Sequence, residues 1–210
     1  FLNYPVVSGN VSFYNGTNKK NISPTPVIGG VGLISKFKNQ INHQFIKDDS
    51  IILLIGKTFG HLEQSVFLEE VHSIAEGRPP EVNLTNEKNN GESVLEIFKS
   101  NLLNSVHDVS SGGLLISLAE MSMGNKYGVK LNKPKNLQNL LEYFFGEDQS
   151  RYVLEIDEKN FSVVEKILKN NNVFYEIIGR TQKNYFEIQK ELKISTKELY
   201  KINDQWYNNY

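Results

Sequence analysis

The chain of 210 residues is long enough to bury a hydrophobic core, and a hydrophobic content of 39% excludes a disordered protein. Its 23 Lys and Arg residues nearly balance 24 Asp and Glu residues, so the formal net charge of −1 provides no overall basic field for binding nucleic acid. The sequence has no cysteine, no apolar run of about 18 residues and no signal-peptide pattern, which together predict a cytoplasmic protein that does not span a membrane.

The first 24 residues predict the end of an incomplete domain. The sequence opens on Phe-Leu-Asn-Tyr-Pro-Val-Val without an initiating Met, which is typical of a domain interior, so we expect a fragment of a longer chain. Residues 4–8 predict a short buried strand, and the polar residues after it lead to a Pro-Thr-Pro turn at residues 24–26. We therefore expect one domain to end at residue 24 and a C-terminal domain to occupy residues 25–210.

Polar groups follow the first strand at Gly9, Asn10 and Ser12. If the chain stays extended, the side chains of Asn10 and Ser12 project from the same face, and Gly9 leaves the backbone open to close approach. An amide oxygen, a hydroxyl group and backbone N–H groups suit a phosphate and a hard cation such as Mg²⁺. A plain turn is the alternative, because Ser, Gly and Asn are also common turn residues.

Strands and helices alternate over residues 25–210, which predicts a mixed α/β, or α+β, domain. The continuous apolar run of residues 51–55 predicts a strand covered on both faces, and residues 179–183 predict a turn between two later strands. Ser195, with Glu198 three residues later, is typical of a helix N-terminus. The expected strands are residues 26–34, 51–55, 127–131, 151–156, 173–178 and 184–188, and the expected helices are residues 62–74, 82–99, 112–123, 137–144, 161–168 and 195–206.

A polar elbow joins a strand to the third of these helices. Ser110 or Ser111 is expected to cap the helix, while Gly112 and Gly113 would let backbone N–H groups approach an anion at the helix N-terminus. The alternative is that the glycines only permit close packing and that the preceding His-Asp pair bonds to the backbone of the elbow.

Glu147 and Asp148 are a further pair of candidate groups. Two adjacent carboxylates could serve acid–base chemistry. Their place between a predicted helix and a predicted strand favours a solvated turn with a helix-terminal contact instead.

Four sequence blocks follow one another along the chain. They are Pro-Val-Val-Ser-Gly-Asn-Val-Ser-Phe-Tyr-Asn at residues 5–15, Pro-Thr-Pro-Val-Ile-Gly-Gly-Val-Gly-Leu at residues 24–33, His-Asp-Val-Ser-Ser-Gly-Gly-Leu at residues 107–114 and Phe-Gly-Glu-Asp-Gln-Ser-Arg-Tyr at residues 145–152. In this order they resemble the C-terminal part of phosphoribosylformylglycinamidine synthase, in the synthetase subunit of its small, multi-subunit type. The resemblance covers essentially the whole chain.

The resemblance implies a fold like that of aminoimidazole ribonucleotide synthetase, in which an N-terminal α/β domain precedes an α+β domain. It also implies a reaction of purine synthesis. ATP phosphorylates the amide oxygen of formylglycinamide ribonucleotide, and glutamine-derived ammonia displaces phosphate to give formylglycinamidine ribonucleotide, ADP and phosphate. The implied partners are a glutaminase subunit, a small bridging subunit and a missing N-terminal half of the same chain.

The resemblance assigns roles by position in the matching blocks. Gly9 would contact ATP, Asn10 would hold Mg²⁺ and Ser12 would bind the substrate. In large single-chain relatives the elbow binds Mg²⁺ and a nucleotide, which would place Asp108 and Ser110 at a secondary site. No catalytic residue is implied in this chain, because in the family the catalytic histidines and the Lys that meets ATP lie in the first half.

The chain departs from the family pattern at the elbow. Ser111 stands where the family usually has an acidic residue, which removes one oxygen ligand and most of the negative charge from a second metal site. Two alternatives stay open. Selenophosphate synthetase and the hydrogenase-maturation dehydratase share a similar elbow but lack the block at residues 5–12, and a structural half could instead serve only to dock the glutaminase complex.

Overall fold

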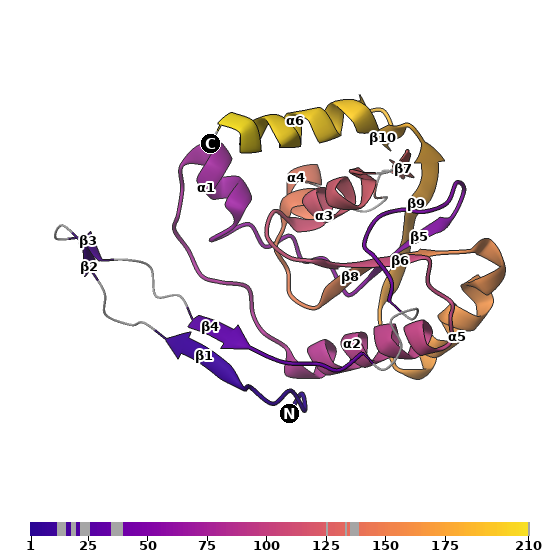
Figure 1. Cartoon of the computed structure of the whole chain (residues 1–210), viewed down its shortest axis with the longest axis horizontal. Helices are drawn as coiled ribbons and strands as arrows, with labels where there is room; N and C mark the ends of the chain where they lie inside the picture. The colour runs from indigo at the N-terminus through magenta and orange to yellow at the C-terminus, as the bar shows by residue number, and fades with distance from the viewer. Residues whose placement is uncertain are drawn as a thin grey trace. The chain divides into compact units, whose positions relative to one another are not determined.

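The computed structural model describes residues 1–11, 16–17, 20–21, 26–34, 40–124, 126–132, 134 and 139–209. Contacts divide the chain into two units, Phe1–Gln40 and Ile41–Tyr210, each with its own strands (Figure 1). Within the described residues, no helix is long and apolar enough to cross a membrane.

The first unit contains two small antiparallel ribbons. One ribbon pairs β1 (Ser8–Val11) with β4 (Pro26–Gly29), and the other pairs β2 (Gly16–Thr17) with β3 (Lys20–Asn21). All four residues of β1 are exposed, because no second layer covers a ribbon of two strands in the described part of this unit.

Two expectations for this region change. The buried strand expected at residues 4–8 is wrong, since the strand begins at Ser8 and is exposed, and the strand expected at residues 26–34 ends at Gly29. The expected domain boundary after residue 24 lies outside the described residues and stays a prediction. Because β4 pairs with β1, residues 26–29 cluster with the first unit.

The second unit contains the strands β5 (Ile51–Ile55), β6 (Ser105–Val109), β7 (Tyr127–Leu131), β8 (Arg151–Ile156), β9 (Tyr175–Lys183), β10 (Tyr185–Ile188) and β11 (Leu192–Ser195), and the helices α1 (Val66–His72), α2 (Leu84–Lys99), α3 (Gly113–Ser122), α4 (Leu140–Phe145), α5 (Phe161–Asn170) and α6 (Thr196–Asn209). The strands form one sheet in the order β11-β10-β7-β9-β5-β8-β6. Neighbours run antiparallel except β10 and β7, which run parallel.

Helices cover both faces of this sheet. Alternate residues of β5 point to opposite sides, so Ile52 and Leu54 join a core with residues of α3 and α4, while Ile51, Leu53 and Ile55 join a core with residues of α2 and α5. Figure 1 shows α3 and α4 above the strands and α2 and α5 below them. The predicted α+β fold and the strand buried on both faces are confirmed.

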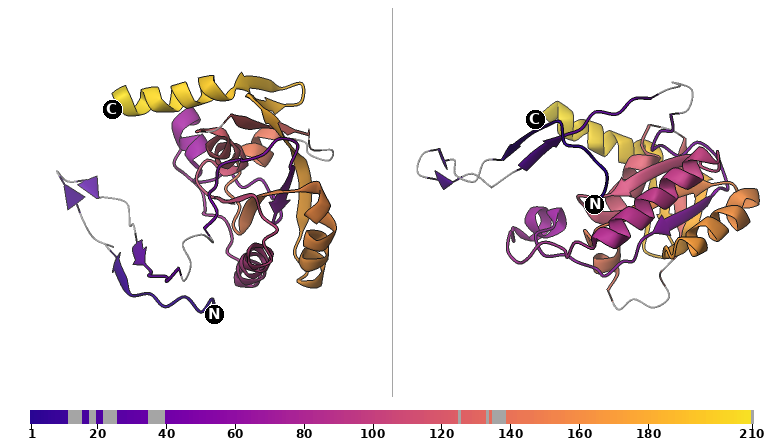
Figure 2. Two further views of the ribbon diagram at one scale, coloured as in Figure 1. Left: turned by 45° about the vertical axis from the view of Figure 1, so that its right-hand side comes forward. Right: turned by 90° about the horizontal axis from the view of Figure 1, so that it is seen from below.

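The C-terminal elements differ most from expectation. The turn expected at residues 179–183 is wrong, because β9 continues to Lys183 to pair with β7, and the chain turns at Asn184, whose φ is 65°. The strand β11 was not expected. Helix α6 is capped by Ser195, whose Oγ accepts a hydrogen bond from Glu198 N at 3.1 Å as predicted, and it runs outward along one end of the unit (Figure 2).

Candidate functional site

Gly9 and Asn10 lie in β1, opposite Ile28 and Val27 of β4. A Cβ atom added to Gly9 would lie 2.7 Å from the carbonyl oxygen of Val27, so the strand pairing by itself requires glycine at this position. Both residues are exposed and therefore accessible to a ligand. Ser12 lies outside the described residues, so its predicted place on the same face as Asn10 stays a prediction.

The chemistry of Asn10 suits a magnesium site only in part. An amide oxygen is a suitable ligand for a hard cation, and Mg²⁺ usually keeps several waters and takes further oxygens from substrate phosphates. Within the described part of the chain, no group of three or more His, Cys, Asp or Glu residues could hold a metal ion. An ion at Asn10 would therefore depend on oxygens supplied from outside this set.

The elbow between β6 and α3 is built on two glycines in left-handed conformation. Gly112 has φ 81° and Gly113 has φ 72°. Gly112 is the N-cap of α3 and no side chain of the elbow caps the helix, so the expectation that Ser110 or Ser111 does so is wrong. The left-handed turn brings Gly112 N within 2.8 Å of Glu147 Oε1, and this distant carboxylate takes the place of the serine cap.

The histidine of the elbow is held by its surroundings. His107 Nδ1 lies 2.7 Å from the carbonyl oxygen of Asp108, and Nε2 lies 3.1 Å from a carboxylate oxygen of Glu120. Its ring also meets the ring of His43 edge-on, with 5.2 Å between the centroids. These contacts favour the alternative in which the elbow's polar residues bond to their own neighbourhood.

The segment of residues 146–151, here called the carboxylate turn, connects several loops. Glu147 Oε1 accepts hydrogen bonds at 2.8 Å from Gly112 N and from Val66 N, the first residue of α1. Asp148 accepts three backbone hydrogen bonds, from Phe59 N and Gly60 N at 3.0 Å and from His61 N at 3.2 Å. The two carboxylates of this turn thus form hydrogen bonds with the elbow, with the start of α1 and with the loop after β5.

Arg151 stabilises the carboxylate turn by hydrogen bonds to its backbone. Its side chain is fully buried and donates to the carbonyl oxygens of Asp148 and Gly146 and to Thr58 Oγ1. Burial lowers the pKa of Arg151, and the negative charge of Asp148, 3.9 Å away, opposes that shift. Because Asp148 is only 4% exposed, the expectation that this turn is solvated is wrong for Asp148. The expected helix-terminal contact is confirmed, since Glu147 accepts from the first residue of α1 and from the N-cap of α3.

A pocket of about 370 Å³, here called the elbow pocket, brings together the two residues of the predicted secondary site, Asp108 and Ser110. Burial raises the pKa of Glu87. The pKa of Tyr152 is raised by burial and then by the negative charges of Glu87 and Asp108. Among the described residues, the lining includes Glu87, Asp108, Ser110, Glu147 and Tyr152 but no Lys or Arg.

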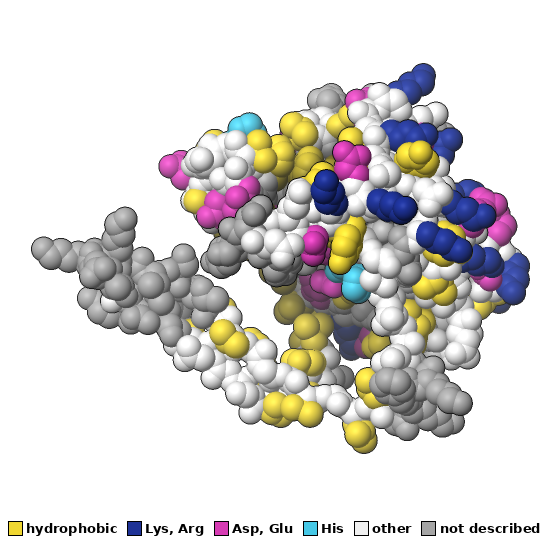
Figure 3. Space-filling model, turned by 45° about the horizontal axis from the view of Figure 1, so that its top comes forward, with side chains coloured by type: hydrophobic (Ala, Val, Ile, Leu, Met, Phe, Trp, Pro, Cys, Tyr) yellow, Lys and Arg dark blue, Asp and Glu magenta, His cyan; other side chains and the backbone are white. Residues whose placement is uncertain are grey.

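This charge pattern limits what the elbow pocket can bind. Figure 3 shows Lys and Arg side chains gathered on one face of the molecule. A phosphate group would meet only negative charge here unless a cation accompanied it. The carboxylate of Asp108 and the hydroxyl of Ser110 are oxygen donors that fit Mg²⁺, so they could hold such a cation together with phosphate oxygens.

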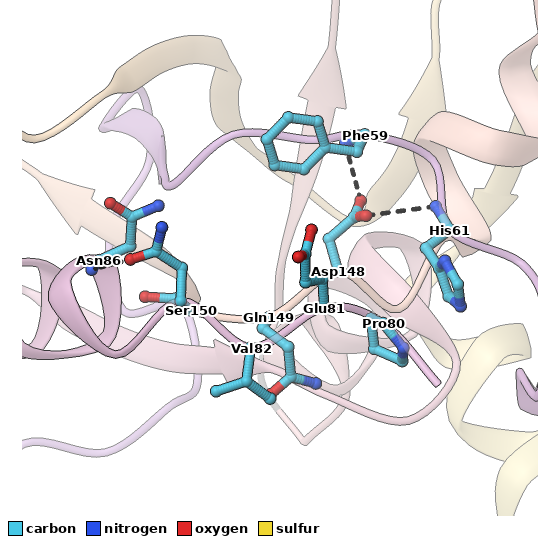
Figure 4. A pocket seen from close by; sticks show the side chains of 10 residues that line it. Phe59, His61, Pro80, Glu81, Val82, Asn86, Asp148, Gln149 and Ser150 are labelled. Atoms are coloured by element: carbon cyan, nitrogen blue, oxygen red, sulfur yellow. Dashed lines mark hydrogen bonds between the residues drawn. The ribbon is translucent and has the colours of Figure 1, made fainter. Parts of the chain in front are cut away.

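A second pocket of about 470 Å³, here called the Phe59 pocket, lies beside the elbow pocket. Pro80, Gln149 and Ser150 line both of them. Figure 4 shows Phe59 above the Asp148 carboxylate, His61 to its right, and Asn86 and Ser150 to its left. The sequence did not point to Phe59, Glu81 or Asn86, because Phe59 follows β5, Glu81 precedes α2 and Asn86 lies in α2 itself. Only the block at residues 145–152 signalled this region.

We expect Glu147→Ala to loosen α1. This helix has no buried residue, and Glu147 binds its first backbone N–H, so loss of the shared carboxylate should lower the free energy of unfolding by about 1–2 kcal/mol. Hydrogen exchange should accelerate at Val66 more than in β5. Glu147→Gln, which keeps an oxygen but no charge, is the matched control and should show a smaller change; equal exchange in all three proteins would contradict the cap.

The sequence of the chain is similar to that of one protein family. The family described as "AIR synthase related protein, C-terminal domain" matches residues 47–189. Over its whole length the chain is 44% identical to phosphoribosylformylglycinamidine synthase subunit PurL of Pelagibacter ubique, 39% identical to that of Rhodopseudomonas palustris strain BisB5 and 41% identical to that of Nitrobacter hamburgensis. It spans 28% to 29% of the length of these relatives.

Solved structures share the fold. PurL of Thermotoga maritima complexed with FGAR matches 83% of the chain with a TM-score of 0.63 at 14% sequence identity, and the chain covers 30% of that protein. The structure of PurLQS from the same organism matches 83% with a TM-score of 0.61 at 12% identity, and the chain covers 29% of it. At such low identities the likeness extends to the fold alone.

Proposed function

This chain belongs to the AIR synthase related protein family, and from that membership we propose that it serves as the C-terminal part of the synthetase subunit of a phosphoribosylformylglycinamidine synthase. The observation that carries this proposal is the 44% identity to a subunit of that name over all 210 residues. An identity of this level over the whole length of the chain supports a shared role as well as a shared fold. The chain spans 29% of that relative, so the complete activity needs further parts.

In this proposal the chain contributes to an ATP-dependent carbon–nitrogen ligation in the cytoplasm. ATP phosphorylates the amide oxygen of formylglycinamide ribonucleotide, and ammonia from a glutaminase subunit then displaces phosphate to form the amidine. The names of solved relatives, which include complexes with ATP and with FGAR and an assembly called PurLQS, support ATP, this substrate and additional subunits as partners. The assembly would include the glutaminase, a small bridging subunit and an N-terminal synthetase half.

The roles of individual residues follow from position and chemistry. We assign Gly9 to ATP contact, Asn10 to Mg²⁺ and Ser12 to the substrate, where their bare backbone, amide oxygen and hydroxyl suit a phosphate-bearing ligand. Bound Mg²⁺ would supply charge neutralisation for the transferred phosphoryl group. Asp108 and Ser110, which line the elbow pocket together, form the proposed secondary nucleotide and metal site.

We expect the 210-residue chain alone to release no phosphate above background from ATP, Mg²⁺, ammonia and formylglycinamide ribonucleotide. Gly9, Asn10 and Ser12 cannot act as a general base near neutral pH, and positioning without a proton acceptor leaves most of the rate enhancement missing. A phosphate-release assay checks this. Substrate-dependent turnover by the isolated chain would contradict the assignment of roles.

A chimera tests the proposed function itself. We expect the Pelagibacter ubique relative to keep substrate-dependent phosphate release when this chain replaces its matched region. In that chimera, Asn10→Ala or Ser12→Ala should lower turnover on the order of tenfold or more with little change in Tm, because both residues bind ligands and do not fill a core.

Val11→Ala, in the same strand, is the matched control and should leave turnover near that of the parent chimera. A chimera that folds with the parent Tm but releases no phosphate would overturn the proposed function. Normal turnover in both variants would overturn only the assignment of Asn10 and Ser12.

A further inference from the structure

The Phe59 pocket exposes an aromatic ring on a loop that is held firmly. Phe59 is 77% exposed, yet its backbone N–H and those of the next two residues are all bound by the buried carboxylate of Asp148. Such bonds fix the loop, so the ring is presented to solvent by a rigid support. An exposed ring in a fixed position offers a planar apolar surface to a ligand at low entropic cost.

The pocket also contains hydrogen-bond acceptors that the fold does not use. Glu81 has no ion pair and accepts no hydrogen bond from any described residue, and the side-chain amides of Asn86 and Gln149 likewise bond to no described residue. In Figure 4 the Glu81 carboxylate projects into the space below Phe59 and above Gln149 and Val82. One wall is therefore aromatic, the opposite wall includes Val82, and acceptors lie between them.

The charges around this space favour a cation. In the part of the chain that the structure describes, no Lys or Arg lines the Phe59 pocket or the elbow pocket. The charge of Asp148 is balanced by its three backbone donors and by Arg151, whereas that of Glu81 is unbalanced among the described residues. The adjoining elbow pocket adds the carboxylates of Glu87 and Asp108. The described carboxylates of this pair of pockets would therefore repel an anionic ligand that arrives without an accompanying cation.

We propose that the Phe59 pocket binds the guanidinium group of an arginine side chain from a protein partner. A guanidinium is planar, donates hydrogen bonds only and stacks on aromatic rings, which matches the ring of Phe59, the free carboxylate of Glu81 and the amide oxygens of Asn86 and Gln149. An ammonium group shares the charge but not the planar shape.

The source of the guanidinium is a polypeptide and not free arginine. The two pockets share Pro80, Gln149 and Ser150, so a ligand in one extends toward the other. The carboxylates of the elbow pocket would repel the α-carboxylate of free arginine, and this repulsion would offset the attraction of its α-ammonium group. A peptide carries no charge at that position, and flanking backbone can continue along the second pocket.

Titration followed by NMR or calorimetry tests the proposal on the 210-residue chain. The probes are N-acetylarginine amide, N-acetyllysine amide, N-acetylcitrulline amide and free arginine. We expect saturable binding that is strongest for N-acetylarginine amide, weaker for the lysine probe and for free arginine, and weakest for citrulline, which has the same shape without the charge. Phe59→Leu and Glu81→Gln should each weaken the arginine probe roughly three- to fivefold.

Matched controls separate the site from general surface effects. Phe174→Leu removes an exposed ring and Glu76→Gln removes an exposed carboxylate, both outside the pocket, and neither should change binding. All four positions are exposed, so folding should persist, and Tm confirms it. No saturable binding of the arginine probe, equal binding of the citrulline probe, or unchanged affinity in both pocket variants would each overturn the proposal.

Discussion

Gly113→Ala is expected to prevent stable folding of the second unit, and Gly113→Val even more so. A Cβ atom on Gly113 would lie 2.7 Å from the carbonyl oxygen of Gly146, 2.7 Å from the carbonyl carbon of Phe145 and 2.9 Å from the carbonyl oxygen of Phe144. All three contacts are backbone atoms at the end of α4, which cannot rotate away as a side chain can. The obstacle is therefore the helix end and not the sheet.

The backbone of Gly113 adds a second cost. Its φ of 72° is in the left-handed region, which an L-residue with a side chain occupies only with strain. Together the strain and the clash should lower the free energy of unfolding by more than about 4 kcal/mol. Chemical denaturation followed by circular dichroism measures the loss.

Gly91→Ala is the matched control within the same unit. Gly91 lies in α2, where the nearest contact of an added Cβ atom is the Tyr152 hydroxyl at an ordinary 3.6 Å. Alanine should therefore stabilise the helix by up to about 1 kcal/mol. If Gly113→Ala kept the stability of the unchanged chain, the close approach of α3 to the end of α4 would be refuted.

Arg151→Met is expected to cause the second large loss, about 3–5 kcal/mol, or roughly 10 °C in Tm. The buried guanidinium donates to two carbonyl oxygens and to Thr58, and it is the cation nearest the buried carboxylate of Asp148. Methionine can fill the space but supplies no donor. The buried carbonyl groups and the charge of Asp148 would then lose their partner.

Arg151→Lys distinguishes the contribution of the positive charge to stability from that of the planar guanidinium geometry. Lysine keeps the charge but cannot reach several acceptors in a fixed planar arrangement, so its loss should lie between those of the unchanged chain and Arg151→Met. A double-mutant cycle with Asp148→Asn measures the coupling. Additive effects of the two changes would indicate that Arg151 does not compensate Asp148.

The candidate site could be predicted only in part, because some of its residues are neighbours in the sequence and others are brought together only by the fold. The blocks around Asn10 and Asp108 are contiguous in sequence, so their chemistry could be recognised in the printed order of residues. The N-terminal cap of α3 could not be predicted from local sequence, because Gly112 N donates to Glu147, which is 35 residues away along the chain. A serine beside a helix start is the usual local solution, and the fold replaced it with a distant carboxylate.

The same distinction explains the errors in the fold. Buried strands with continuous apolar residues, such as β5, and amphipathic helices carry their own periodicity, so local pattern was sufficient to identify them. The length of β9 depends on its two partners, β5 and β7, and no local feature of residues 179–183 reports that pairing. The pairing outweighed the turn preference of the segment.

By itself, the sequence determined the α+β class, most helices and buried strands, the cap at Ser195 and the family resemblance, because all of these rest on neighbouring residues or ordered blocks. Only the tertiary structure decided that Asp148 and Arg151 are buried and that Glu147 joins α1 to the elbow. It also decided that Phe59, Glu81 and Asn86 share one pocket. The reason is physical: whether a charged or aromatic side chain meets water, a backbone donor or another loop depends on chain segments that are remote in sequence, and no local pattern encodes their approach.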